Sequence, residues 1–353
     1  MNLLLFQNRQ ELEEYLLKYN LPTYRATQIV DWIFSKGVFD FSMMSNLPKE
    51  LISTLEKNDQ IFIPKVVKVQ HSIDGCKKLL LKLIDGKKIE MVFIPNKKKN
   101  TLCISTQVGC KMGCSFCATS KMGFDRDLDS SEIVAQFLLA KSLFGQIGSI
   151  VFMGMGEPLD NYYNLISSIF SLKNLANFSP RRITISTCGV APKIDKLSES
   201  GLKVKLALSL VSPISEKRKK LMPIARKYPL QEVKNSLFNY AKKTNRKVTI
   251  EYLLLNDFNT SKKDVAKLRC FVGDLSCKVN VIPFNRIVDF DFAKPSKKKA
   301  LEFTNNLRQT LPVAVTLRDS RGVDIAAACG QLAGDSFIIE DGELKMENEN
   351  VEC

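Results

Sequence analysis

Three cysteines within eight residues are the most distinctive chemical feature of this 353-residue chain. Cys110, Cys114 and Cys117 have the spacing C-x₃-C-x₂-C, and the loop contains no fourth cysteine. Three thiolates can bind a four-iron cluster and leave one iron open to a substrate. A structural zinc site normally has four ligands, usually in two separated C-x₂-C pairs, so zinc and a chance grouping are the weaker alternatives. The spacing therefore predicts an iron–sulfur cluster.

The elements that must position this loop alternate between strands and helices over residues 101–334. Such alternation predicts an α/β fold, with a parallel sheet covered by helices. The predicted strands are 102–106, 149–153, 182–186, 204–210, 248–254, 278–284 and 313–317. The predicted helices include 131–144, 214–221, 230–243, 262–271 and 298–310. The number of units predicts a partial or full (βα) barrel, whose chemistry belongs at the carboxyl ends of the strands.

Three further regions flank this barrel core. Residues 1–60 have helical periodicity and are expected to form a small accessory domain. Residues 61–100 are expected to be a β-hairpin extension or linker, because the strand-like runs 79–84 and 89–94 are joined by Asp85-Gly86. Residues 335–353 contain seven acidic residues and one lysine, and we expect a disordered tail.

Charge and cysteine content limit the function classes. The net charge is +15, and because the tail carries −6, residues 1–334 carry +21. A body this basic favours nucleic acid as partner, although a lysine-rich proteome is an alternative explanation. No apolar run approaches the ~18 residues of a membrane span, and the start lacks signal-peptide features. We expect a cytoplasmic protein with no membrane contact, whose ten cysteines are metal ligands, catalytic thiols or packing residues.

Two motifs together resemble the radical S-adenosylmethionine (SAM) superfamily. They are the three-cysteine loop and Gly154-Met-Gly-Glu-Pro158, which is similar to the GGE-type segment that holds the methionine amino group in that superfamily. A dinucleotide fingerprint fits poorly, since the third glycine is missing and Pro158 intervenes. Longer blocks, covering nearly the whole chain, are similar to RlmN-type adenosine methyltransferases: 24–29, 101–110, 152–158, 181–187, 221–224 and 321–332.

This resemblance implies a methyl relay through two cysteines. An aromatic carbon of adenine is not nucleophilic, whereas a thiolate can accept a methyl cation. In the family, a first SAM methylates the cysteine matching Cys329, and a second yields a 5′-deoxyadenosyl radical that removes hydrogen from this methyl group. The carbon radical adds to the base, and the cysteine matching Cys103 then attacks the sulfur, releasing product and leaving a disulfide.

Glu90 is a further candidate, because it lies in the otherwise apolar run 89–94. Desolvation there would raise the pKa of its carboxyl group and suit it to act as a base, and the matching family glutamate is the proposed proton acceptor. An outward-facing position on an alternating strand is the alternative. Cofactor contacts carried over by position are Gly156, Glu157, Ser186, Ser209, Leu210, Val211 and Asn285. Val211 replaces a family histidine, so only a backbone contact would survive there.

The resemblance implies a 4Fe-4S cluster and SAM as cofactors, and RNA as substrate. The expected targets are 23S ribosomal RNA, near the peptidyl-transferase region, and the adenosine next to the anticodon in a subset of tRNAs, both methylated at carbon 2. We also expect an external flavodoxin- or ferredoxin-like electron donor and a monomer. The alternatives are a Cfr-like carbon-8 methyltransferase and a non-catalytic, metal-containing RNA-binding protein. Cys188, Cys270 and Cys277 are expected to be packing residues, and Cys76 and Cys353 to be exposed.

Overall fold

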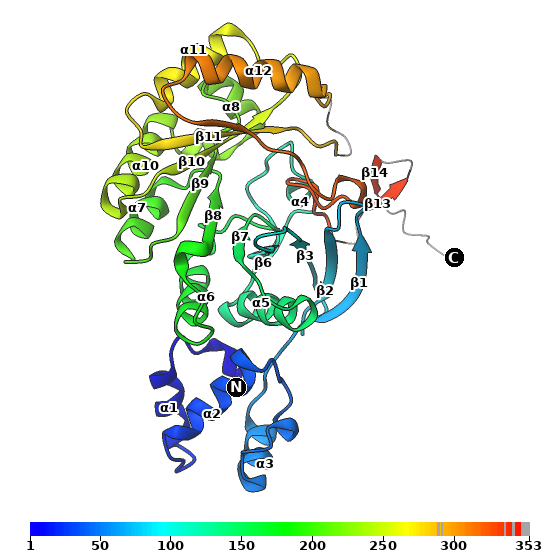
Figure 1. The fold of residues 1–353 in the computed structure, drawn as a ribbon, viewed down its shortest axis with the longest axis vertical. Helices are drawn as coiled ribbons and strands as arrows, with labels where there is room; N and C mark the ends of the chain where they lie inside the picture. Colours follow the sequence, from blue (N-terminus) through cyan, green and yellow to red (C-terminus); the bar gives the residue numbers. More distant parts are fainter. Residues whose placement is uncertain (288–289, 291, 335–336, 341–342, 347–353) are drawn as a thin grey trace.

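One ten-stranded sheet runs through the molecule in the computed structural model (Figure 1). The structure describes residues 1–287, 290, 292–334, 337–340 and 343–346, the last two ranges by their backbone alone. The sheet has the order β1-β2-β3-β4-β7-β8-β9-β10-β11-β12. Its strands are β1 (Lys65–His71), β2 (Lys77–Lys82), β3 (Lys88–Ile94), β4 (Thr101–Cys103), β7 (Ser149–Phe152), β8 (Ile183–Thr187), β9 (Lys205–Ser209), β10 (Val248–Leu254), β11 (Cys277–Pro283) and β12 (Val315–Leu317).

The strands from β4 to β12 form the barrel part of the sheet. Each pairs in parallel with its neighbour, and the connections between them contain helices. Among the described residues β1 and β12 are the two edges of the sheet, so the barrel is partial, with seven parallel strands. The predicted α/β class and the predicted barrel are confirmed. Because all these strands run in parallel, their carboxyl ends meet at one rim, where the chemistry was expected.

Helices lie around the outside of the curved sheet (Figure 1). The first long one, α5 (Ser130–Phe144), begins with a capping box between Asp129 and Glu132 and is followed by Gly145, whose φ is +72°. The other long helices of the barrel are α6 (Tyr162–Asn174), α7 (Ala191–Glu199), α10 (Leu230–Thr244), α11 (Lys262–Val272) and α12 (Lys297–Thr310). Shorter helices are α4 (Ala118–Lys121), α8 (Ser215–Leu221) and α9 (Ile224–Lys227).

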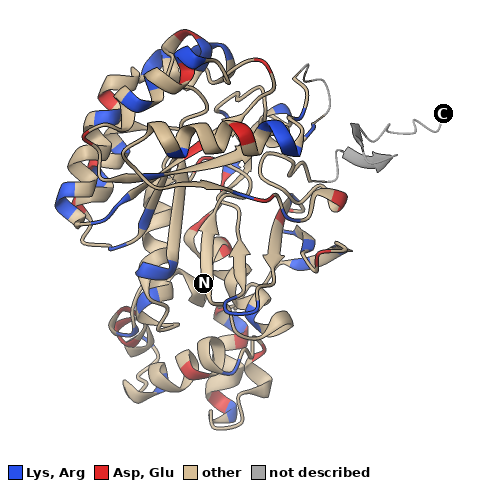
Figure 2. Cartoon of the chain, turned by 45° about the horizontal axis from the view of Figure 1, so that its top comes forward, with Lys and Arg blue, Asp and Glu red and all other residues tan. Residues whose placement is uncertain are grey.

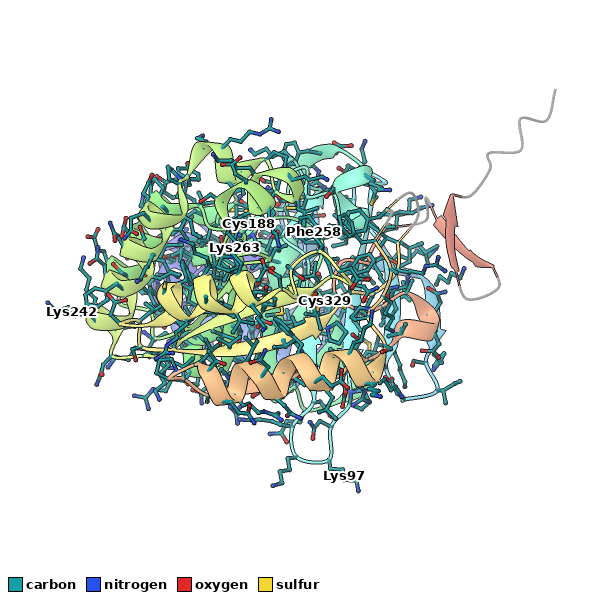
Figure 3. The ribbon with its side chains drawn as sticks, turned by 90° about the horizontal axis from the view of Figure 1, so that it is seen from above. Lys97, Cys188, Lys242, Phe258, Lys263 and Cys329 are labelled. Carbon is teal, nitrogen blue, oxygen red and sulfur yellow. The ribbon has the colours of Figure 1, made fainter. Side chains whose placement is uncertain are left out.

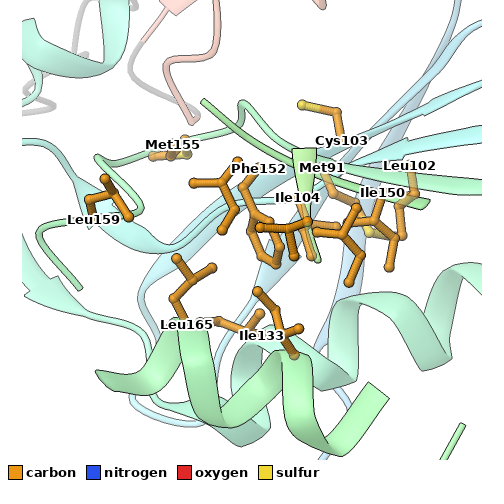
Figure 4. Close-up of a cluster of buried hydrophobic side chains, with 14 of the residues drawn as sticks. Met91, Leu102, Cys103, Ile104, Ile133, Ile150, Phe152, Met155, Leu159 and Leu165 are labelled. Atoms are coloured by element: carbon orange, nitrogen blue, oxygen red, sulfur yellow. The ribbon is translucent and has the colours of Figure 1, made fainter. Parts of the chain in front are cut away.

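The apolar core between sheet and helices fixes the direction of the site residues. Leu102, Ile104 and Ile150 point from the sheet toward Ile133 of α5 in Figure 4. Cys103 lies between two of these residues, and its side chain points to the opposite face (Figure 4). Alternation along the strand therefore places the Cys103 thiol inside the barrel.

The predicted hairpin extension is part of the main sheet and not a linker. Strands β1, β2 and β3 are antiparallel, and β3 pairs with β4, which continues the barrel sheet. The predicted turn at Asp85-Gly86 is confirmed, with Gly86 at φ +86°. Strand β1 was missed because it is an edge strand whose residues are largely exposed, so it lacks the apolar alternation that predicts strands.

The amino-terminal residues form the expected group of helices beside the barrel (Figure 1). They comprise η1 (Leu3–Leu5), α1 (Arg9–Leu17), α2 (Tyr24–Val30), the π-helix η2 (Asp31–Ser35), η3 (Phe41–Met43) and α3 (Lys49–Asn58). The Asn2 amide donates to the Ser131 hydroxyl of α5 at 2.8 Å, and the Ser171 hydroxyl of α6 donates to the Phe6 carbonyl at 2.9 Å. This domain therefore docks on the outer helices.

Part of the expected disordered tail has regular structure. Strands β13 (Phe337–Glu340) and β14 (Glu343–Met346) pair as an antiparallel ribbon, because a short apolar run interrupts the acidic residues. The other residues of 335–353 lie outside the described part of the chain. No helix among the described residues combines the length and the apolar character that crossing a membrane requires.

Candidate active site

The three-cysteine loop lies between the two strands of a small hairpin at the carboxyl rim of the barrel. Strands β5 (Gln107–Gly109) and β6 (Phe124–Asp127) pair, and the Cys110 amide donates to the Gly123 carbonyl at 2.7 Å. Gly109 has φ +73°, and a Cβ added there would lie 2.0 Å from the Gly123 carbonyl oxygen. Only glycine fits this turn, which starts the loop in the required direction.

The loop is bonded to the segment that carries Cys329. The Ala118 amide, directly after Cys117, donates to the carbonyl of Gly330 at 2.7 Å. All four thiols, Cys110, Cys114, Cys117 and Cys329, line one cavity of about 170 Å³. Seen from above, Cys329 lies toward the middle of the molecule (Figure 3). The structure thus brings residues more than 200 positions apart to one site.

The chemistry of the three thiols fits an iron–sulfur cluster. Burial and, to a smaller extent, the charges of neighbouring cysteines raise the pKa of Cys110 to about 12 and that of Cys114 well above its usual range. Thiolates in such surroundings need a positively charged metal centre. Within the described residues no three His, Cys, Asp or Glu side chains are close enough to hold a single metal ion. Three thiols without a fourth suit a four-iron cluster with one open iron, whereas a structural zinc site normally has four ligands.

The glycine-rich segment after β7 forms one wall of this cavity. Gly156 has φ +95°, and an added Cβ would lie 2.5 Å from the Cβ of Gln107. A Cβ at Gly154 would lie 2.6 Å from the Ile104 carbonyl oxygen. The main chain at Gly154 and Gly156 therefore lies too close to its neighbours to carry a side chain. Both glycines line the cavity, and the space in front of Gly156 is open.

Glu157 is buried at the same wall and is rigidly bound. Its carboxylate accepts hydrogen bonds from the amides of Cys188 at 2.8 Å and Leu159 at 3.1 Å, and its own amide donates to the Gln107 side chain. Burial raises the pKa of the Glu157 carboxyl group. A fixed carboxylate in a desolvated wall can stabilise an ammonium group in the cavity.

A further wall, the strand-end wall, is formed by residues at or near the carboxyl ends of neighbouring strands. Ser186 is the next-to-last residue of β8, Ser209 ends β9, and Glu251 lies in the middle of β10, all lining the cavity. Val211 also lines it and has φ +61°, a rare conformation for a β-branched residue. The Asn259 amide donates to the Val211 carbonyl at 2.7 Å and helps to fix this backbone.

One buried oxygen of this wall is left without a partner. Glu251 Oε1 accepts from Asn280 at 3.2 Å, whereas no hydrogen-bond partner of its Oε2 is present in the structure. Burial raises the pKa of this carboxyl group. An unpartnered buried oxygen facing a cavity is expected to bind a ligand donor.

A second cavity, of about 80 Å³, adjoins the first and contains the second predicted catalytic thiol. Cys103 and Cys329 both line it, and Cys329 also lines the first cavity. Asn285 lies here, with its buried Oδ1 unpartnered, and not at the strand-end wall with the other predicted cofactor contacts. The two thiols therefore share one chamber, and Cys329 lies between this chamber and the three-cysteine loop.

Arg318 dominates the electrostatics of the second cavity. Burial and, to a smaller extent, the charge of the neighbouring Cys329 raise the pKa of Cys103 to about 12, although Arg318 acts in the opposite direction. The pKa of Cys329 is likewise raised, first by burial, and lowered in part by Arg318. The Cys329 side chain is exposed to the cavities, although protein surrounds it on its other sides. Arg318 is thus the cation that stabilises either thiolate.

Glu90 is buried in an ion pair that fastens the Cys329 segment. Its Oε1 lies 2.9 Å from the Lys78 ammonium, and its Oε2 accepts from the amides of Ala333 at 2.7 Å and Gly334 at 2.9 Å. Lys78 also donates to the carbonyl of Ala326 at 3.3 Å. The outward-facing alternative for Glu90 is wrong. The purely apolar surroundings expected from the sequence are also wrong, because Lys78 reaches it across the hairpin.

Most predicted site residues line the two cavities, with two exceptions among the described residues. Glu90 and Leu210 line neither; Leu210 is fully buried and its amide donates to the Glu251 carbonyl. Cys277 is buried as expected, and Cys188 is buried but also lines the first cavity. Two expectations are wrong: Cys76 is buried against a turn, and Cys270 is exposed. Cys353 lies outside the described residues.

Sequence reasoning missed Arg318, Lys78 and the free oxygen of Glu251. Arg318 directly follows β12, so the rule that chemistry lies at strand ends could have found it. Lys78 pairs with Val92 and Glu90 with Leu80, which makes Lys78 and Glu90 diagonal neighbours on one face. The Asp85-Gly86 turn was recognised, but its register was not used to find this pair.

Comparison with known proteins identifies the family. The family described as "Radical SAM superfamily" matches residues 104–268, and that described as "Ribosomal RNA large subunit methyltransferase N-terminal domain" matches residues 1–61. A "Probable dual-specificity RNA methyltransferase RlmN" from Clostridium botulinum (strain Eklund 17B / Type B) is 43% identical over 327 residues, which cover 92% of this chain and 94% of that protein. A protein of the same name from Dictyoglomus thermophilum is 41% identical over 351 residues, 98% of this chain and 100% of that protein.

A solved structure agrees with these relatives. A radical SAM methyltransferase from Sphaerobacter thermophilus is 38% identical and superimposes with a TM-score of 0.90, covering 95% of this chain and 99% of that one. The superfamily uses a 4Fe-4S cluster and SAM. The three clustered thiols, the space in front of Gly156 and the unpartnered oxygens of Glu251 and Asn285 fit these groups. The chain therefore belongs to the RlmN family of radical SAM methyltransferases.

Proposed function

We propose that this chain methylates carbon 2 of adenosine in 23S ribosomal RNA, near the peptidyl-transferase region, and in a subset of tRNAs, next to the anticodon. The relatives are named as dual-specificity RNA methyltransferases, and this chain matches them along nearly its whole length. The observation that carries the proposal is the position of Cys329, which shares one cavity with the three-cysteine loop and a second with Cys103.

Cys110, Cys114 and Cys117 would hold the cluster, and the amino and carboxylate groups of SAM would lie near Gly156 and Glu157. When bound and reduced, the cluster and SAM supply the 5′-deoxyadenosyl radical that removes a hydrogen atom from an S-methyl group. The further cofactor contacts would come from the strand-end wall and the second cavity, at Ser186, Ser209, Leu210, Val211 and Asn285. Leu210 can take part only through its backbone, because its side chain is fully buried.

Cys329 is the proposed methyl carrier. Its thiolate accepts the methyl group of a first SAM, because sulfur is nucleophilic where the adenine carbon is not. Arg318 favours the charged form of this sulfur. Two SAM molecules are then used per turnover, one for the methyl group and one for the radical.

Cys103 is the proposed resolving thiol. After the S-methylene carbon has bonded to the base, the adduct radical loses the proton of carbon 2 and one electron, which the oxidised cluster would take up. The Cys103 thiolate then attacks the Cys329 sulfur and a disulfide forms, while the bond from sulfur to the methylene carbon breaks and that carbon keeps the electron pair and takes up a proton to become the methyl group. Both sulfurs face the same cavity, as this attack requires. The disulfide must be reduced before the next turnover.

Glu90 is proposed to accept the proton that leaves the modified carbon. Its carboxylate accepts hydrogen bonds from the main chain four and five residues after Cys329, so Glu90 contacts the segment that carries the methyl carrier. Because Lys78 and two amides now bind both of its oxygens, this role requires the Cys329 segment to shift during turnover.

The remaining expectations concern the cellular setting. We infer that the enzyme acts as a monomer in the cytoplasm, where its RNA substrates are, and that a flavodoxin- or ferredoxin-like protein supplies the reducing electron.

The test is methylation of a transcript by protein purified without oxygen. Digested tRNA and 23S ribosomal RNA fragments should yield 2-methyladenosine in mass spectrometry, and a variant with Cys114→Ser should yield none. Cys270→Ser, which changes an exposed thiol outside both cavities, is the matched control and should be active. Formation of 8-methyladenosine would identify a carbon-8 enzyme instead, and a colourless, inactive zinc protein would refute both enzymatic functions.

A further inference from the structure

A basic cavity lies at the end of the barrel opposite the active site. It has a volume of about 560 Å³ and is open to solvent. Its lining residues precede or begin the parallel strands from β8 to β11, and they share a positive or polar character: Arg181, Lys203, Lys205, Thr244, Asn245, Arg246, Lys247, Thr249 and Lys278. We call it the basal cavity. Six of its nine residues are cations, and none is acidic.

The cations on the strands face the inside of the barrel. Lys205 and Ser209 are four residues apart on β9, so their side chains lie on the same face of the strand. Ser209 lines the first cavity, inside the barrel, and Lys205 lines the basal cavity. Lys278 and Ile282 have the same relation on β11. Four residues of strand span about 13 Å. The basal cavity is therefore the lower mouth of the barrel, and it is separate from the site of chemistry.

Some cations in other basic stretches of the chain have partners within the protein. Lys217 lies 2.8 Å from Asp264, and Lys219 lies 3.1 Å from Glu216. Arg218 is buried and donates to the carbonyl of Ser209. Lys299 lies 3.6 Å from Asp257. Figure 2 shows Lys and Arg on many elements of the barrel, so basicity alone does not distinguish the basal cavity.

The basal cavity has no such counter-charge in the described part of the chain. None of its six cations takes part in an ion pair there. The pKa of Lys205 is lowered by burial and then by the neighbouring charges of Lys278, Lys99 and Arg246. Like charges held together in this way repel one another and stabilise a bound anion.

We propose that the basal cavity binds the phosphodiester backbone of the substrate RNA, at a segment away from the target adenosine. This inference rests on the proposed RNA substrate. The lining offers lysine, arginine and amide donors but no aromatic ring on which a base could stack. Phosphate contacts of this kind raise the affinity for RNA and fix its position on the protein, but they do not depend on the base sequence. A site that makes such contacts therefore suits an enzyme whose targets lie in different RNAs.

The test compares two double variants of equal charge in the holoenzyme. Lys205→Gln with Lys278→Gln removes the two inward-facing cations, while Lys242→Gln with Lys267→Gln removes two exposed lysines that do not line the cavity. Binding of full-length tRNA is measured at several KCl concentrations. The slope of log affinity against log salt should fall by up to about 2 in the first variant and stay unchanged in the second, since each lost phosphate contact lowers it by about 1.

Turnover separates this inference from the proposed function. The Lys205→Gln, Lys278→Gln variant should raise KM for full-length tRNA about tenfold, with kcat and the turnover of a short anticodon stem-loop unchanged. Its unfolding temperature without RNA should be no lower than that of the wild type, because repulsion is removed. Unchanged affinity and salt slope in this variant, with active wild-type enzyme, would overturn the basal site alone. Absence of methylation by the wild type on both substrates would instead overturn the proposed function, and the site with it.

Discussion

The Cys329 sulfur lies between opposing influences on its charge. Burial and the carboxylate of Glu251 raise its pKa, whereas the guanidinium of Arg318 lowers it, and the net effect is an increase. The thiolate is the form that accepts a methyl group, so its population limits the first step of the relay. Arg318 therefore acts through its charge, because it keeps the population of the Cys329 thiolate larger than burial alone would allow.

The rate of Cys329 methylation should rise with pH. Because its pKa is raised, the proton-free form is scarce at neutral pH and increases through and beyond the usual thiol range. Arg318→Gln should move this profile to higher pH and slow methylation at neutral pH by at least tenfold, while Arg318→Lys should move it less. Transfer from isotope-labelled SAM, measured at several pH values, checks this. An unchanged profile in Arg318→Gln would show that the guanidinium does not act on the sulfur.

At the level of elements, the β2–β3 hairpin and the segment 326–334 form one unit. The sequence predicted the hairpin and, separately, a cysteine-bearing segment near the carboxyl end. Their contact could not be predicted, because the pairing of Glu90 with the amides of Ala333 and Gly334 spans more than 240 residues. Long-range backbone contacts of this kind leave no periodic signal in the sequence.

Glu90→Gln should destabilise the protein strongly. It leaves the buried Lys78 ammonium without a counter-charge, which costs about 3–5 kcal/mol of unfolding free energy. The double variant Lys78→Met, Glu90→Gln should recover most of this loss. Denaturant unfolding of wild type, both single variants and the double variant forms the required cycle.

This cycle also separates structure from chemistry at Glu90. A double variant that is stable, yet releases no methylated RNA, would support the proposed proton acceptor. Equal stability of wild type and Glu90→Gln would contradict the stabilising role of the ion pair between Lys78 and Glu90.

Gly156→Ala should abolish SAM binding. The added Cβ meets the Cβ of Gln107 at 2.5 Å in a conformation with φ +95°, so the segment 154–158 must shift away from Gln107 and change the wall of the cavity. Gly145→Ala is a matched control, since its φ is +72° but nothing lies within 4 Å of the added Cβ. The control should lose only about 1–2 kcal/mol of stability and bind SAM normally. Equilibrium dialysis with labelled SAM gives the comparison, and equal binding by both variants would refute the role of this wall.

For the whole molecule, apolar periodicity was enough to predict most of the barrel. The run 248–254 was predicted with the bounds that β10 has, and α11 was predicted to within one residue, because β10 is a largely apolar run buried on both faces and α11 buries one largely apolar face. The edge strand β1 and the cations Arg318 and Lys78 escaped prediction. Their roles depend on which distant residue lies opposite them, and one sequence contains no information about that pairing.

Loss of the cluster should loosen the whole rim of the barrel. The three-cysteine loop is bonded to Leu221 on one side and, through Ala118, to Gly330 on the other. Bound metal stabilises the folded state by mass action, so its removal should lower the unfolding temperature by several degrees. Thermal unfolding and limited proteolysis before and after treatment with oxidant and chelator check this. Identical unfolding and equal protection of residues 326–334 would show that the loop is ordered without the cluster.

The methyl carrier is the centre of this account, and it can be observed directly. Protein expressed with an intact cluster and purified without oxygen should be digested, and the peptide that contains Cys329 analysed by mass spectrometry. We predict S-methylcysteine at Cys329, with Cys103 unmodified, and we predict loss of this methyl group after single turnover with RNA. An unmethylated Cys329 in protein that nevertheless converts adenosine to 2-methyladenosine would contradict the relay.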